Sequence, residues 1–269
     1  MQAGMAEMER LSPGRGAFGA EFWNAKGRAV RYAEAAEDVT GDPLLARLRR
    51  ATGRTTALLD VGAGTGRYTL ALAPRVQQVV SVDASRAMLG VLRRKAREQG
   101  VTNIRCLEST WQDVALEVAT PADVAVCSYV LPLIAEAEPF LAKIDAACRQ
   151  RAFVSMNAMS ADAVVDPFWR HFHGAPRRPA PTYLDAAAIL TDLGLSPEVE
   201  VVEIRTRVRH ADLRAAVRAY CEMLVLPDTP AVRAELRSLL SGWLVEEAGS
   251  LRSPVKTLPT AIVSWAGHA

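Results

Sequence analysis

The hydrophobic positions of this chain fall into short apolar runs separated by stretches of helical periodicity. The runs at 57–61, 79–83 and 123–129 are rich in Val, Leu and Ala and are too short for a helix, so they predict buried strands. Residues between Ser85 and Gly100 repeat apolar side chains on one face, and these two residues suit the start and end of a helix. Strands that alternate with helices are typical of α/β proteins with a parallel sheet.

The same alternation extends over the rest of the chain, apart from residues 1–20, which show no periodicity. Further strands are expected at 103–108, 152–156, 198–208 and 260–265, and further helices at 21–36, 44–50, 136–150, 182–194 and, as a pair, within 210–250.

The run at 57–61 is followed by three glycines at alternate positions, Gly62, Gly64 and Gly66. Glycine has no Cβ, so the backbone of such a turn can approach a ligand closely. The helix that follows would offer free N–H groups and a partial positive charge. A phosphate-binding P-loop has Lys and then Ser or Thr after its last glycine, whereas this chain has Arg67 at the first of these positions. A dinucleotide-binding fingerprint requires a small residue where Arg67 stands, so it fits imperfectly.

The order Asp60-x-Gly62-x-Gly64-x-Gly66, followed by a second strand that ends in Asp83, resembles the first motifs of class I S-adenosylmethionine-dependent methyltransferases. The resemblance covers residues from about 55 to 157 by motif and extends from there to the C-terminus by element order. It implies an α/β fold with a doubly wound, mostly parallel seven-stranded sheet, one antiparallel strand and flanking helices. The single domain 1–269 then comprises a tail and helical lid (1–50), a nucleotide-binding core (51–157) and a substrate-side half (158–269) with a helical insertion at about 210–250.

The resemblance also implies S-adenosylmethionine as cofactor and S-adenosylhomocysteine as product. The glycine backbone and Asp60 would position the methionine part, and the carboxylate of Asp83 would accept the ribose hydroxyls. The expected cofactor-binding residues are Asp60, Gly62, Ala63, Gly64, Gly66, Asp83, Ala84, Met88, Thr110, Trp111, Ser128 and, in the helical lid, Tyr32. For Met88 and for the aromatic residues of the lid, packing in the core is the alternative interpretation.

Two departures from the family pattern bear on the site. Ser109-Thr110 stands where related proteins often have Gly-Asp, so Asp113 either supplies the missing carboxylate or caps the next turn. The exit of the 123–129 strand lacks the Asn/Asp-Pro-Pro motif of enzymes that methylate exocyclic amino groups of DNA bases. Cys127 at that exit is interpreted as a small buried thiol rather than a nucleophile.

Residues 157–181 are the least regular part of the chain and follow the carboxyl end of a strand, which is the ligand side of an open α/β sheet. Trp169 and Phe172 are expected to enclose a substrate, and Arg177 and Arg178 to hold an anionic group. The alternative is a surface loop with a hydrophobic anchor. The candidates for a general base are His171, His173 and Tyr129. Two histidines spaced His-x-His are too few ligands for a metal site, and none is predicted.

The amino-acid composition excludes several classes of binding partner. The net charge of +2 argues against a dedicated nucleic-acid binder, no apolar run reaches membrane-spanning length, and four scattered cysteines fit a reduced, cytoplasmic protein. We therefore expect a small-molecule acceptor and no membrane partner, with the inserted helical pair either covering the substrate or forming a homodimer contact. Two other functions remain open: an NAD(P)-dependent oxidoreductase of the same fold, and a non-catalytic methyltransferase-like partner protein.

Overall fold

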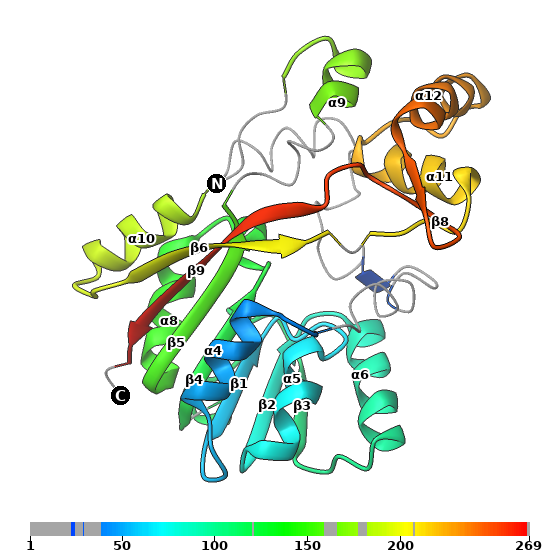
Figure 1. Ribbon diagram of the computed structural model, residues 1–269. Helices are drawn as coiled ribbons and strands as arrows, with labels where there is room; N and C mark the ends of the chain where they lie inside the picture. The colour runs from blue at the N-terminus through cyan, green and yellow to red at the C-terminus, as the bar shows by residue number, and fades with distance from the viewer. Residues whose placement is uncertain are drawn as a thin grey trace.

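A seven-stranded sheet forms the centre of the molecule in the computed structural model (Figure 1), which describes residues 23, 24, 29, 39–119, 121–158, 166–176, 182–206 and 208–267. The strand order is β3-β2-β1-β4-β5-β9-β6. β9 is antiparallel to both neighbours and the other pairs are parallel. The strands are β1 (Ala57–Val61), β2 (Gln78–Asp83), β3 (Ile104–Glu108), β4 (Ala122–Ser128), β5 (Cys148–Asn157), β6 (Glu198–Arg205) and β9 (Thr257–Ala266). The predicted sheet, with its single antiparallel strand, is confirmed.

Helices cover both faces of the sheet (Figure 1). α4 (Pro43–Ala51) and α5 (Arg67–Leu72) pack on one face through a cluster that includes Leu48, Leu72 and Phe153. α8 (Ala137–Ala147) and α10 (Tyr183–Asp192) pack on the other face. α6 (Arg86–Glu98) contributes Leu89 and Leu92 to a smaller cluster beside β3. The short elements are α7 (Leu116–Ala119), η1 (Ala73–Arg75) and η2 (Leu131–Leu133).

Side-chain caps explain where several helices begin. Asp42 accepts the backbone N–H groups of Leu44 and Leu45 at the start of α4. Ser85 accepts the N–H of Met88, as its position in the sequence predicts. At α10 Thr182 and Asp185 form the expected capping box, with Asp in place of the usual Glu or Gln.

The insertion between β6 and β9 forms, together with α9, a separate layer that we call the cap. It contains α9 (Asp166–His173), α11 (Leu213–Met223), α12 (Pro230–Trp243) and a hairpin of β7 (Val245–Glu247) and β8 (Ser250–Arg252). The cap has its own apolar core, in which the ring of Phe168 lies 5.8 Å from that of Tyr220 and 5.0 Å from that of Trp243. The helical pair is confirmed. The hairpin was not predicted, because strands of three residues are too short to show periodicity.

Some predicted boundaries were wrong. The helix expected at 136–150 ends at Ala147, because Cys148 is already paired with Ala122 of β4, and Arg151 with β9. The strand expected at 198–208 ends at Arg205. Of the helix expected at 21–36, only residues 23, 24 and 29 are described, and they are helical. Among the described residues, no helix has the length and hydropathy needed to cross a bilayer.

A buried polar chain ties β1, α5 and β2 together below the glycine turn. Thr69 of α5 donates its hydroxyl to the carboxylate of Asp60 at 2.6 Å and lies 2.8 Å from the hydroxyl of Ser81. Asp60 is 2 % exposed. Burial raises its pKa from 3.8 to about 6, against the lowering effect of the Thr69 hydrogen bonds.

This raised pKa predicts a pH dependence of stability. A carboxyl group that binds its proton more tightly in the folded state stabilises the fold fully below its unfolded pKa of 3.8, and this contribution is lost as the pH rises through about 6. The loss is at most about 3 kcal/mol at about 1.4 kcal/mol per pKa unit. In Asp60→Asn the free energy of unfolding, measured with urea between pH 4 and 7, should fall less with pH than in the wild type. Asp192→Asn, on the exposed side of α10, is the control, and superimposable profiles for Asp60→Asn and wild type would contradict the assignment.

Candidate functional site

The turn between β1 and α5 is built by three glycines with positive φ: 73° at Gly62, 55° at Gly64 and 89° at Gly66. A Cβ at Gly62 would lie 2.2 Å from a methyl of Val130, and one at Gly66 would lie 2.3 Å from a methyl of Leu92, so packing excludes side chains there. A Cβ at Gly64 would meet no atom within 4 Å among the described residues. The turn is therefore packed at its two ends and open at its middle residue, which forms a cradle that a ligand can enter.

Asp83, at the end of β2, lies beside this open position. One carboxylate oxygen accepts the N–H of Gly64 and the other accepts the N–H of Ser85, each at 2.8 Å. Burial raises the pKa of this carboxyl group, and the two backbone hydrogen bonds lower it. Each oxygen keeps a further lone pair, so the group can accept two hydroxyl donors such as those of a ribose.

The other expected cofactor residues differ in their surroundings. Ala84 is half-buried directly after Asp83, and Ala63 is buried in the glycine turn. Met88 is buried with Ala29 and Val91 and is packed by Trp23, which favours the core interpretation for its side chain. Asp60 faces Thr69 of α5 rather than the open side of the turn, so any effect on a ligand is transmitted through α5. Tyr32 lies outside the described residues.

The expectation that the Trp111 side chain binds the cofactor needs correction. Trp111 is 3 % exposed in the α8 side of the core and donates its indole N–H to the carbonyl of Phe140 at 3.3 Å. A ring buried in this way presents no face to a ligand. Thr110 is exposed, and its hydroxyl accepts the N–H of Asp113 at 3.3 Å, so Asp113 closes a local turn.

The end of β4 carries a row of hydroxyl groups on the α4 side of the sheet. Ser128 lies 2.8 Å from the hydroxyl of Ser155 on β5, and the Tyr129 hydroxyl lies 3.0 Å from that of Thr260 on β9. Tyr129 has a φ of 59° and is 37 % exposed. A positive φ at an aromatic residue is rare, and such strain concentrates at functional sites. Cys127, one residue earlier, is fully buried, and burial raises the pKa of its thiol, so it is no nucleophile.

The aromatic and histidine candidates of α9 make contacts that hold the cap together. Trp169 is 2 % exposed in the cap core, so its predicted role as a substrate wall needs correction, whereas Phe172 is partly buried against the same core. His171 Nε2 lies 2.7 Å from Glu235 of α12, and His173 Nε2 lies 2.8 Å from the carbonyl of Leu224. Both candidate bases thus join α9 to the α11–α12 pair. Arg177 and Arg178 lie outside the described residues.

Sequence reasoning missed a polar group that joins the segment before α4 to the glycine turn. The Asp42 carboxylate pairs with the guanidinium of Arg67 and accepts the hydroxyl of Tyr68 at 3.3 Å. Burial raises the pKa of the Tyr68 hydroxyl, and the nearby Ser128 hydroxyl acts in the opposite direction. Asn24 was missed as well: its side-chain oxygen accepts the hydroxyl of Ser85, two residues after Asp83, at 2.8 Å. Residues 42 and 67 are 25 apart in the chain, so no local pattern signals their contact.

The described residues contain no group of three or more His, Cys, Asp or Glu side chains suited to a metal ion.

Comparison with known proteins points to one family. The sequence profile of the Methyltransferase domain matches residues 58–151. The Bacillus subtilis protein named uncharacterized methyltransferase YcgJ is 28 % identical over 118 residues, which are 43 % of this chain and 46 % of that protein. The tRNA 5-carboxymethoxyuridine methyltransferase of Escherichia coli K12 is 28 % identical over 109 residues, 40 % of this chain and 42 % of that protein. The matched segments therefore span less than half of these curated relatives.

Solved structures share the fold over most of the chain. The crystal structure of Bacillus subtilis YcgJ has a TM-score of 0.55 at 18 % identity and covers 84 % of this chain and 98 % of its own. Magnesium protoporphyrin IX methyltransferase from Synechocystis PCC 6803, with bound S-adenosylhomocysteine, has a TM-score of 0.60 at 15 % identity and covers 92 % and 97 %. Fold, glycine turn and sequence profile agree: residues 58–151 match a methyltransferase domain, and the chain is similar in fold to class I S-adenosylmethionine-dependent methyltransferases.

Proposed function

We propose that the chain transfers the methyl group of S-adenosylmethionine to a small organic acceptor. The observation that carries the proposal is the open backbone at Gly64 beside the carboxylate of Asp83. The residues present fit the cofactor: the glycine turn leaves room for its methionine part, and Asp83 has lone pairs for both ribose hydroxyls. The cofactor supplies an activated methyl group on its sulfonium sulfur. The protein therefore has to orient the acceptor and exclude water, and it needs no covalent intermediate.

The acceptor is proposed to lie between the end of β4 and the cap. The insertion leaves the sheet at Arg205 and returns at Thr257, which are paired residues at the carboxyl edge of the parallel strands. Figure 1 shows the cap on that side of the sheet. Tyr129 is the one base candidate that stands at the end of a sheet strand, so we assign it the contact with the acceptor. Phe172, Arg177 and Arg178 remain proposed acceptor contacts.

A small acceptor is favoured over a nucleic acid by the net charge of +2. The relatives do not decide this point, because one is named for tRNA and another for magnesium protoporphyrin IX. Release of S-adenosylhomocysteine should be screened with small carboxylates, phenols and amines, and in parallel with bulk tRNA. Turnover with tRNA alone would overturn the small-acceptor proposal and leave methyl transfer standing.

Asp83→Ala should weaken S-adenosylmethionine binding at least tenfold, because two ribose hydroxyls lose a charged acceptor and such hydrogen bonds contribute roughly 1.5–3 kcal/mol. Isothermal titration calorimetry measures the affinity, and circular dichroism checks the fold. Asp83→Asn, which keeps one acceptor oxygen, should bind with intermediate affinity. An unchanged affinity in folded Asp83→Ala would remove the ribose assignment.

Gly64→Val should abolish cofactor binding, because the side chain would fill the open cradle. Its matched control is Gly100→Val at the end of α6, where φ is 67° and a Cβ also meets no atom within 4 Å among the described residues. The backbone strain is the same in kind at both positions. Both variants should therefore lose similar stability in thermal unfolding, and only Gly64→Val should lose binding. Normal binding by Gly64→Val would show that the glycine serves the fold alone.

Tyr129→Phe should lower kcat/KM for the acceptor about tenfold, the loss expected for one hydrogen bond of about 1.4 kcal/mol, and leave S-adenosylmethionine affinity unchanged. Thr260→Val removes the hydroxyl partner of Tyr129 and serves as the control for a purely structural effect. If both variants lose the same activity, Tyr129 positions the strand and does not contact the acceptor.

A further inference from the structure

β6 ends the sheet on one side and leaves a long backbone edge without a strand partner among the described residues. It hydrogen-bonds to β9 alone, in unbroken register from Glu198 opposite Ser264 to Arg205 opposite Thr257. Soluble proteins usually protect such an edge with proline, lysine, a bulge or a covering element. β6 contains no proline, lysine or bulge. The edge is therefore regular enough to accept another strand.

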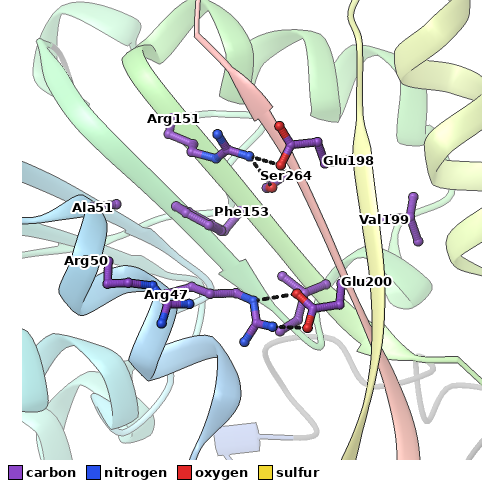
Figure 2. A pocket seen from close by; sticks show the side chains of 10 residues that line it. Arg47, Arg50, Ala51, Arg151, Phe153, Glu198, Val199, Glu200 and Ser264 are labelled. Carbon is purple, nitrogen blue, oxygen red and sulfur yellow. Dashed lines mark hydrogen bonds and ion pairs between the residues drawn. The ribbon is translucent and has the colours of Figure 1, made fainter.

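The exposed side chains of β6 alternate between the two faces of the sheet, and Glu203 and Arg205, nearer the end of the strand, share a face with its two exposed valines. Val199 is 41 % exposed and Val201 is 49 % exposed, and alternation along the strand places both on the same side of the sheet. Glu198 and Glu200 occupy the other side, above Phe153 and Ile262. Figure 2 shows the two glutamates turned toward a pocket of about 550 Å³ and Val199 turned away from it.

Glu198 and Glu200 do not protect the edge by free charge, because each is paired within its own subunit. Arg47 of α4 donates its Nε–H to Glu200 at 2.9 Å and makes a second contact with the other carboxylate oxygen. Arg151 of β5 pairs with Glu198 and also donates to Ser264 at 3.0 Å. Both pairs are visible in Figure 2. Exposed ion pairs contribute little to stability, but these two cancel the acidic charge that would repel a second acidic strand.

We propose that β6 pairs antiparallel with β6 of a second copy of this chain and joins the two sheets across a two-fold axis. A two-fold contact requires a self-complementary edge, and β6 provides one. With residue 200 on the axis, Val199 faces the partner's Val201 and Val201 faces the partner's Val199, so the four exposed valines form one apolar group. On the other side the two Glu200 side chains meet, each neutralised by its own Arg47. β4, β5 and β9 separate this edge from β1, so the glycine turn stays accessible in the dimer.

The test is the molar mass of the full chain, measured by size-exclusion chromatography with light scattering over a range of micromolar concentrations. The wild type should be a dimer. Val201→Lys should raise the dimer dissociation constant at least tenfold, since lysine on an edge strand opposes strand pairing. Val208→Lys, at a valine that is 56 % exposed outside the strand, should leave the mass unchanged. Circular dichroism and thermal unfolding establish that the variants are folded.

A second pair of variants tests the charge argument. Arg47→Ala should weaken the dimer, because it exposes the charge of Glu200 on both strands, and high salt should restore it. Adding Glu200→Gln to Arg47→Ala should restore the dimer at low salt. A monomeric wild type over the whole concentration range would overturn the proposal. So would a dimer that is insensitive to Val201→Lys, because its contact would then lie elsewhere, for example on the α11–α12 pair. Neither result bears on methyl transfer.

Discussion

The hydrogen bond from the N–H of Gly64 to the carboxylate of Asp83 is the contact on which the proposed cofactor site depends. It joins the turn after β1 to the end of β2, and the N–H groups of Gly62 and Ala63 reinforce it by donating to the carbonyl of Val82. The turn is therefore fixed before any ligand arrives. Fixed donors and acceptors lose little entropy on binding, so a preorganised turn converts more of its contacts into affinity. The same contact explains why the acid must stand at the end of β2 and no further along the chain.

The sequence predicts this part of the molecule well because its determinants are local. Three glycines with positive φ can be inferred from their spacing, and apolar runs of five or six residues identify the strands on either side. The acid at 83 follows from the end of the second run. These signals lie within about 30 residues and match a motif, so the fold and the glycine–acid pair were within reach of sequence reasoning.

The direction in which an aromatic or polar side chain points was not predictable in the same way. Trp111 and Trp169 both stand in segments that border the site, yet each ring turns into a core and is almost fully buried. His173 reaches the carbonyl of Leu224, which lies 51 residues further along the chain. Such contacts arise from packing between elements that are distant in sequence, and neither periodicity nor composition contains that information. For the same reason the pairing of Asp42 with Arg67 emerged only from the structure.

The insertion that carries α11, α12 and the β7–β8 hairpin leaves the sheet and returns to it at one point, because Arg205 and Thr257 are paired across β6 and β9. The cap core, which joins Phe168 of α9 to Tyr220 of α11, is separate from the clusters that pack against the sheet. The glycine turn is fixed by β1 and β2, whereas the acceptor is proposed to lie between the end of β4 and the cap. The proposed sites for the cofactor and the acceptor are therefore separated along the sheet, so a change in one need not alter the other.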